Sequence, residues 1–127
     1  MTTQEAVLTT QEVADRFSQL SDQYDFNKIQ EELYAENAVS IEPPQAAAMG
    51  MHNADGMAAI KQKGKDWEAM VEEMHGGYTS KPVVGGNYFA VAMGMDVTIK
   101  GAGRVKMDEI AVYEVKDGKI VKEQFFF

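Results

Sequence analysis

Residues 104–127 read RVKMDEIAVYEVKDGKIVKEQFFF, and this stretch decides the fold. Two runs rich in β-branched and aromatic residues flank the Asp117-Gly118 pair. Asp-Gly between two such runs is typical of a tight turn that joins antiparallel strands. The stretch therefore predicts a C-terminal β-hairpin, on which the rest of the chain is organised.

The turn type of this hairpin decides which side chains share a face of the sheet. A two-residue turn would pair Lys116 with Lys119 and place Glu123 beside Val112, whereas a three-residue loop would pair Val115 with Lys119. We prefer the three-residue loop because it separates a largely apolar face from a mixed one. The apolar face then carries Met107, Glu109, Ala111, Tyr113, Val115, Val121, Glu123, Phe125 and Phe127. The mixed face carries Asp108, Ile110, Val112, Glu114, Ile120, Lys122, Gln124 and Phe126.

The apolar face of this hairpin contains two carboxylates, Glu109 and Glu123. A charged carboxylate among apolar groups must find a donor, raise its pKa or reach water inside a pocket. Two such groups side by side titrate as a pair, which suits acid–base catalysis. The alternative is that the register differs, or that each forms a salt bridge with Arg104, Lys106 or Lys122 at a sheet edge.

Length, charge and composition limit the classes of protein to which the chain can belong. Its 127 residues predict one domain over residues 1–127, and 45% hydrophobic with 25% charged residues is typical of a globular protein. The net charge of −8 argues against nucleic-acid and anionic-membrane partners. No run of apolar residues is long enough to predict a membrane-spanning helix. The chain has no cysteine, and its first residues lack the pattern of a secretory signal, so we expect a cytoplasmic protein.

Helical periodicity precedes the hairpin. Thr9 or Thr10 is placed to cap a helix over residues 11–20, and a second short helix is expected over 26–34. A brief strand at 38–42 stops at a double proline, and residues 45–55 should form a loop. A third helix is expected from Gly56 to about residue 74, ended by the glycines at 76 and 77.

Strand patterns follow the third helix. Residues 78–84 and 88–100 alternate as two strands joined by a Gly-Gly-Asn turn, and the C-terminal hairpin comes next. Helices followed by an antiparallel meander predict an α+β fold, in which helices cover one face of a curved sheet.

Four segments together resemble the SnoaL-like group of the nuclear-transport-factor-2-like fold, which also includes ketosteroid isomerases. They are YAENAVSIEP at 34–43, GMAAI at 56–60, MDEIAVY at 107–113 and DGKIV at 117–121. The resemblance implies a cone, with three N-terminal helices packed in a curved, mainly antiparallel mixed sheet. It also implies a mostly apolar pocket for a small cyclic or polyketide-like molecule, no cofactor, and a homodimer formed through the outer sheet face.

The ketosteroid isomerase pattern can be compared with this chain position by position. The catalytic base, which precedes a proline, corresponds to Glu42 before Pro43. The tyrosine of helix one corresponds to Phe17, which has no hydroxyl, and the protonated aspartate falls near Glu109 or Ala111. The His–Asp pair of polyketide cyclases has no counterpart. The alternative for Glu42 is a solvated carboxylate at a turn.

The remaining candidates are one histidine and a set of apolar side chains. His75 is expected at a helix end, where it either carries a proton in the cavity or simply caps the helix. Neither histidine has partners at the spacing of a metal site, so no metal is expected. Apolar residues expected to line the pocket, or else to fill the core, are Phe17, Trp67, Met93, Met95, Tyr113 and Phe125.

The function expected from this sequence is binding of a small apolar molecule in a cone-shaped pocket. If the protein is an enzyme, Glu42, Glu109 or Glu123 would move a proton next to a carbonyl without a cofactor, giving isomerisation, cyclisation or dehydration. The alternatives are a non-catalytic ligand-binding module and a dimeric scaffold.

Overall fold

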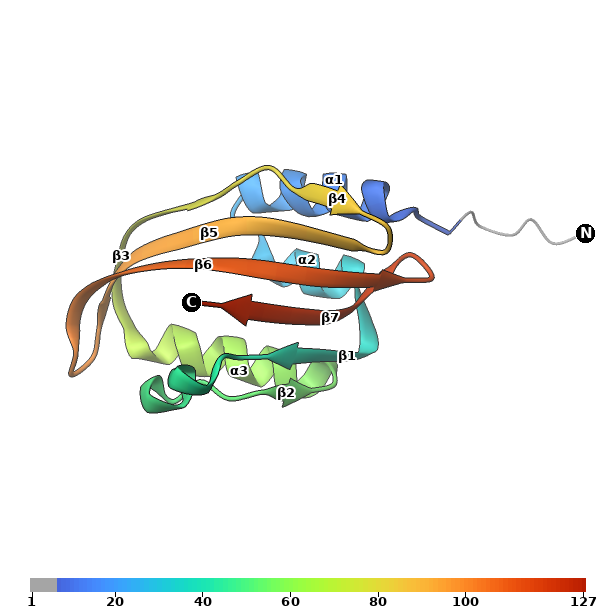
Figure 1. Cartoon of the computed structure of the whole chain (residues 1–127). Coiled ribbons are helices and arrows are strands. Elements are labelled where there is room, and N and C mark those ends of the chain that lie inside the picture. Colours follow the sequence, from blue (N-terminus) through green and yellow to red (C-terminus); the bar gives the residue numbers. More distant parts are fainter. Residues whose placement is uncertain (1–6) are drawn as a thin grey trace, which may run out of the picture.

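A computed structural model describes residues 7–127 as helices packed on one side of a seven-stranded sheet (Figure 1). The absence of a secretory signal was inferred from residues that lie mostly outside this part of the chain. The strand order is β2-β1-β7-β6-β5-β3, and β4 pairs with β5. The pairing of β1 with β7 is parallel and every other pairing is antiparallel. The expected α+β fold with a mixed, mainly antiparallel sheet is confirmed.

The first two helices form where their capping residues and apolar periodicity predict. Helix α1 (Thr10–Asp22) begins after Thr9, whose hydroxyl accepts from the N–H of Glu12 while the Glu12 carboxylate accepts from the N–H of Thr9. Its apolar stripe, which includes Phe17, is buried against the sheet. Helix α2 (Phe26–Leu33) begins after Asp25, whose carboxylate accepts from the N–H of Lys28.

The segment after α2 is more ordered than its composition predicted. Strand β1 (Tyr34–Ile41) begins four residues before the expected strand. The expected loop contains a 3-10 helix, η1 (Pro44–Met49), and a short strand, β2 (Ala54–Asp55), that pairs with β1. Proline at the start of η1 suits a first helical turn, because that N–H has no intrahelical partner.

The predicted end of the third helix was wrong. Helix α3 covers Met57–Met70, and the chain then forms strand β3 (Val71–Thr79), so His75 and both glycines lie in a strand. Pairing along β5 overrides the helical periodicity here. Gly77 is needed for close approach rather than for a helix stop, because a Cβ there would lie 2.9 Å from the carbonyl oxygen of Gly94. The expected strand over 78–84 is replaced by the end of β3 and by β4 (Val83–Gly85).

The long strands β5 (Tyr88–Ile99), β6 (Gly103–Lys116) and β7 (Lys119–Phe126) form the centre of the sheet (Figure 1). The turn between β6 and β7 has two residues, with φ of 52° at Asp117 and 75° at Gly118, and it pairs Lys116 with Lys119. The three-residue loop was therefore wrong. Paired positive φ values are typical of a type I′ turn, which matches the twist of the strands it joins.

A β-bulge restores the predicted face despite the different turn. Val115 pairs with Ile120 and Glu114 with Lys122, which leaves Val121 as an extra residue on β7. Ile120 therefore faces the core, fully buried, instead of Val121. Beyond the bulge Glu123 pairs with Tyr113, so Glu109 and Glu123 share the inner face as predicted, but two residues farther apart along the strands than expected.

The core lies between the helices and the inner face of the sheet. The rings of Phe17, Phe89 and Tyr113 form its aromatic centre, with ring centroids 4.8–5.3 Å apart. Across residues 7–127 no helix is both long and apolar enough to cross a membrane.

Candidate functional site

Glu123 is a buried carboxylate on β7 that two hydroxyl groups hold in place. The Tyr34 hydroxyl donates to Oε1, and the Ser40 hydroxyl donates to Oε2 at 2.8 Å. Both donors come from β1, where the parallel register places Ser40 directly beside Glu123. Burial raises the pKa of Glu123 above its ordinary value, although the two hydroxyl groups and the ammonium of Lys63 oppose this rise.

Lys63 connects Glu123 to a second buried carboxylate, Glu42. Its Nζ on α3 donates to the Ser40 hydroxyl at 2.7 Å and lies 2.5 Å from Oε1 of Glu42. The Glu42 side chain is only 3% exposed, and the Lys63 side chain is 15% exposed. Within the described part of the chain neither carboxylate oxygen of Glu42 has a partner with the geometry of a hydrogen bond, although the ammonium is in contact with Oε1. This contact is an ion pair with incomplete hydrogen bonding.

Glu109 completes a cluster of three carboxylates around this single ammonium. It lies on β6, partly buried, opposite Met93 of β5. Burial raises its pKa to about 7; the negative charges of Glu42 and Glu123 add to the rise, and Lys63 opposes it. A carboxyl group that titrates near neutral pH can both accept and donate a proton.

Two tyrosines lie under the same influence. Burial, followed by the charge of Glu123, raises the pKa values of both Tyr34 and Tyr113 well above their ordinary range. Both hydroxyl groups therefore stay protonated and act as hydrogen-bond donors rather than as acids.

The structure divides the expected pocket residues into two groups. Phe17 and Tyr113 are 2% exposed and belong to the packed core. Met93 and Phe125 are partly buried beside the cluster, and Lys63 Nζ lies 5.2 Å from the centre of the Phe125 ring. Met95 is partly buried farther along β5, opposite Met107.

His75 lies apart from the carboxylate cluster. It sits on strand β3, where its Nε2 lies 2.7 Å from the Thr98 hydroxyl and 3.8 Å from a carboxylate oxygen of Glu73. In residues 7–127 no group of three or more histidine, aspartate or glutamate side chains is arranged to hold a metal ion.

A small cavity adjoins the cluster at Lys63. Its volume is about 190 Å³, and it lies between α3 and the segment around β2. Trp67 lines it, together with Met51, Asn53, Ala59, Lys63 and Met70. The carboxylates Glu42, Glu109 and Glu123 do not line it. Asn53 nevertheless links it to the cluster, because its side-chain oxygen accepts the N–H of Glu42 at 2.8 Å.

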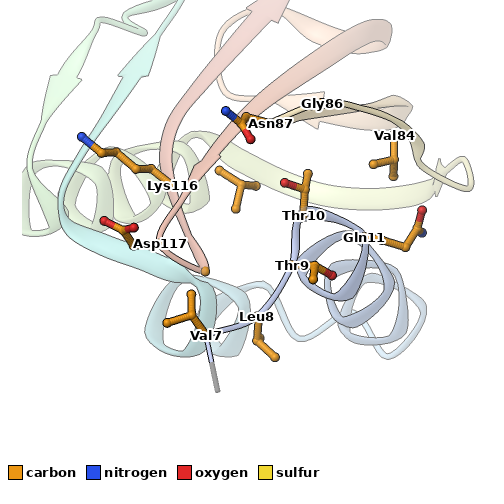
Figure 2. Close-up of a pocket in the computed structure, with 12 residues that line it drawn as sticks. Val7, Leu8, Thr9, Thr10, Gln11, Val84, Gly86, Asn87, Lys116 and Asp117 are labelled. Carbon is orange, nitrogen blue, oxygen red and sulfur yellow. The ribbon is translucent and has the colours of Figure 1, made fainter. Parts of the chain in front are cut away.

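A larger cavity of about 620 Å³ lies at the start of α1, between the β4–β5 and β6–β7 turns (Figure 2). Its charged lining residues are Lys116 and Asp117, both exposed in the turn region. None of the candidate site residues lines it, so we place the site at the smaller cavity, which shares Lys63 with the carboxylates.

Sequence reasoning missed four polar residues of the site: Tyr34, Ser40, Asn53 and Lys63. Two of them carried a usable signal. Ser40 and Glu42 alternate with Ala38 on one face of β1, and Lys63 falls three residues after Ile60 on the inward stripe of α3. A lysine on an apolar helical stripe needs a buried partner, which is the same argument that singled out the glutamates.

The sequence profile of the SnoaL-like domain matches residues 8–127. The chain belongs to the SnoaL-like domain family. No curated protein matches this chain. It is similar to a crystal structure from Mesorhizobium loti, provisionally named a SnoaL-like polyketide cyclase, whose name also carries the words carbohydrate phosphatase. The two share 36% identity with a TM-score of 0.84, over 94% of this chain and 100% of that one.

Two more distant structures show that this SnoaL-like chain has the nuclear-transport-factor-2-like fold. One is a protein of that fold and unknown function from Burkholderia pseudomallei, with 15% identity and a TM-score of 0.74, over 94% and 92% of the two chains. The other, from Catenulispora acidiphila, has a ketosteroid-isomerase-like fold and a bound trimethylamine. It shows 18% identity and a TM-score of 0.68, over 94% and 87% of the chains.

Proposed function

We propose that this SnoaL-like protein binds a small, mostly apolar carbonyl compound and transfers a proton next to the carbonyl, with Glu109 as the acid–base group. The observation that carries the proposal is that Glu109 and Glu123 share the inner face of the sheet, where Ser40 links Glu123 to the ion pair between Lys63 and Glu42. Such a group of like charges is costly to bury, and enzymes use it to bring a carboxyl pKa near neutral pH.

The three carboxylates differ in what they can do. Glu123 has both oxygens occupied by hydroxyl donors, and Glu42 is buried beside Lys63. Glu109 is partly exposed, and its pKa of about 7 keeps both of its protonation states populated near neutral pH. Glu109 is therefore assigned the proton transfer. Burial raises its pKa most, and the charges of the other two glutamates add to the rise.

The proposed step balances without a cofactor. Ionised Glu109 removes a proton from the carbon next to the carbonyl: the C–H bond breaks, an O–H bond forms on the carboxyl, and the electron pair moves to the carbonyl oxygen. Return of the proton to another carbon gives isomerisation, and loss of a neighbouring hydroxyl as water gives dehydration. The cyclase name of the Mesorhizobium loti relative supports this class of chemistry.

Deuterium exchange tests this proposal on a set of model ketones. Mass spectrometry would follow exchange next to the carbonyl in a panel of one-ring and two-ring ketones, dissolved in D₂O with the protein. We expect catalysed exchange that falls about 10²-fold or more in Glu109→Gln. Glu114→Gln, on the outer face of the same strand, is the matched control. Unchanged rates in Glu109→Gln, Glu42→Gln and Glu123→Gln would reject the proposal.

One observation favours a second candidate, a non-catalytic binding protein. The cavity beside Lys63 is not lined by Glu109, so a ligand held there need not meet the proton-transfer group. This candidate predicts ligand retention without exchange, which mass spectrometry of co-purified small molecules would detect.

We also propose a homodimer formed through the outer sheet face. The cross-strand pair Ile110–Phe126 supports it, because both side chains are exposed by close to half on that face, as is Tyr88 on β5. Light scattering should show a dimer that Ile110→Lys disrupts. A monomeric wild-type protein would refute this assembly.

A further inference from the structure

We propose that Ser40 is a positioning residue, whose hydroxyl links the Lys63 ammonium to Glu123 and so holds Glu123 in its ionised form. The inference deepens the proposed function and rests on it, because Glu123 then supplies a fixed negative charge to the cluster in which Glu109 transfers the proton. It is carried by the direction of the hydrogen bonds at Ser40, by the burial of this residue and by its position between two oppositely charged groups.

The direction of both hydrogen bonds at Ser40 is set by Lys63. An ammonium can only donate, so the Ser40 oxygen accepts from Nζ of Lys63 at 2.7 Å. The single hydroxyl proton of Ser40 then goes to Oε2 of Glu123 at 2.8 Å, while Tyr34 donates to Oε1. If a protonated Glu123 donated to Ser40 instead, the hydroxyl proton of Ser40 would lose its acceptor inside the core. The arrangement therefore suits a carboxylate at Glu123 better than a carboxylic acid.

Ser40 also extends the influence of one cation to a second carboxylate. Lys63 reaches Glu42 directly, with Nζ 2.5 Å from Oε1, and it reaches Glu123 through the Ser40 hydroxyl. Ser40 is fully buried and Glu123 is 7% exposed, so water screens this arrangement little. Hydrogen bonds in such a chain polarise one another, which strengthens the bond that Glu123 receives. Loss of the hydroxyl would therefore remove a donor from Glu123 and its link to the ammonium.

The local sequence explains why a serine lies at this point. Ala38, Ser40 and Glu42 alternate on the inner face of β1, and the parallel pairing of β1 with β7 places Ser40 beside Glu123. Lys63 reaches the same point from α3, which packs against β1. A serine that only filled space in the core would leave the ionisation of Glu123 unchanged when replaced by alanine. A titration of Glu123 therefore separates the two roles.

Ser40 acts on Glu109 through the charge of Glu123. Burial raises the pKa of Glu109 to about 7, and the charge of Glu123 is one of the smaller contributions to this rise. Glu123 pairs with Tyr113, which lies four residues beyond Glu109 on β6, a separation of roughly 13 Å. Over this separation, neutralising Glu123 should lower the pKa of Glu109 by about 0.3–1 pH unit.

Carboxyl ¹³C NMR of protein labelled at glutamate measures both titrations, with the resonances assigned in Glu109→Gln and Glu123→Gln. In the wild type we expect Glu123 to be ionised at pH 7. Ser40→Ala should raise the pKa of Glu123 by about 1–2 pH units and lower that of Glu109 by about 0.3–1 pH unit. The opposite directions are decisive. Water admitted by a loosened core would lower both pKa values, because it would relieve the burial that raises them.

The other titratable groups that influence Glu123 come from three elements. Tyr34 and Glu42 lie on β1, Tyr113 lies on β6 with Glu109, and Lys63 lies on α3. The pKa values of both tyrosines are raised well above their ordinary range, mainly by burial, so neither tyrosine titrates together with the carboxyl groups. The Glu42 resonance is assigned in the same way, in Glu42→Gln.

Ser21→Ala is the matched control. Ser21 is a buried serine of α1, 5% exposed, and its hydroxyl has no hydrogen-bond partner within residues 7–127. Its loss should change neither pKa. The link to Lys63 is tested in the Glu42→Gln background, where removal of the lysine leaves no buried carboxylate at position 42. There, Ser40→Ala and Lys63→Met together should raise the pKa of Glu123 by less than the sum of their single effects, and additive effects would overturn the link.

The two proposals fail separately. A protonated Glu123 at pH 7 in the wild type would overturn the role of Ser40, and so would a Ser40→Ala variant in which the pKa of Glu123 does not rise or that of Glu109 does not fall. If both changes are found but no ketone exchanges deuterium, Ser40 keeps its role and the proton-transfer function fails. If Glu109 catalyses exchange and Ser40→Ala changes neither pKa, the reverse holds. Where both proposals hold, the pH of half-maximal exchange in Ser40→Ala should fall together with the pKa of Glu109.

Discussion

Replacing Glu109 with glutamine should stabilise the protein at high pH and not at low pH. The pKa of Glu109 is raised from its ordinary value of 4.5 to about 7, mainly by burial. Because the folded chain holds this proton more tightly than the unfolded chain does, the stability that Glu109 contributes is present below about pH 4.5. It is lost progressively as pH rises to about 7. Glutamine keeps the shape and removes the titration.

The magnitude follows from the size of the pKa change. At 1.36 kcal/mol per pH unit, the rise from 4.5 to about 7 corresponds to an upper limit of about 3.4 kcal/mol. Glu109 is partly exposed, so solvent screening reduces this value. We expect the variant to gain about 1–2 kcal/mol relative to the wild type between pH 5 and pH 8.

Urea denaturation at pH 5 and at pH 8 gives the free energy of unfolding of the variant and of the wild type. The gain is the increase, from pH 5 to pH 8, in the difference between these two free energies. Glu114→Gln is the control, because Glu114 lies on the same strand but faces away from the cluster. Its difference from the wild type should not change with pH by the same amount. A pH-independent difference for Glu109→Gln would refute the argument that this carboxyl is buried among like charges.

Further substitutions test a helix cap, a close contact between strands and a hydrogen bond of the site. Thr9→Ala should cost about 0.5–2 kcal/mol of unfolding free energy, because it removes the cap of α1; equal melting temperatures would contradict this. Gly94→Ala should cost about 1–3 kcal/mol of unfolding free energy, because its Cβ would clash with the Tyr78 ring. In a protein that already carries Tyr78→Ala, the cost of Gly94→Ala should be much smaller. Equal costs with Tyr78 present and with Tyr78→Ala would exclude this clash. Tyr34→Phe should raise the pKa of Glu123 further, because it removes a hydroxyl that donates to the carboxylate. It should cost about 1–3 kcal/mol of unfolding free energy at pH 7 and less at low pH. A cost that does not change with pH would show that Glu123 is not ionised at pH 7.

The fold was largely predictable because its signals are local and repeated. The capped apolar stripe of α1 and the alternation along β5 each specify one element without reference to the rest of the chain. The end of α3 was not predictable in this way. Residues 71–75 continue a helical pattern, but the structure pairs them with β5, and a local pattern does not reveal a partner strand farther along the chain.

The site was predictable only in part, for a different physical reason. Alternation along a strand reveals which face a carboxylate occupies, and this was enough to find Glu109 and Glu123. It does not reveal what lies opposite. Ser40 comes from a parallel neighbour more than eighty residues away in sequence, and Lys63 from a helix that covers the sheet. Such partners depend on strand order and helix placement, which no short pattern specifies.

The extra residue on β7 has a consequence for how the chain tolerates deletions. Val121 has no partner on β6, so its removal would leave Ile120 beside Val115 and Lys122 beside Glu114. The ladder would become regular, and Glu123 would still point inward. Deletion of Lys122 instead would place Val121 opposite Glu114. The pairs from Glu123 onward would then be kept, and the bulge would be lost. The hairpin thus carries one spare position, whose loss flattens the local twist and leaves the inner face intact.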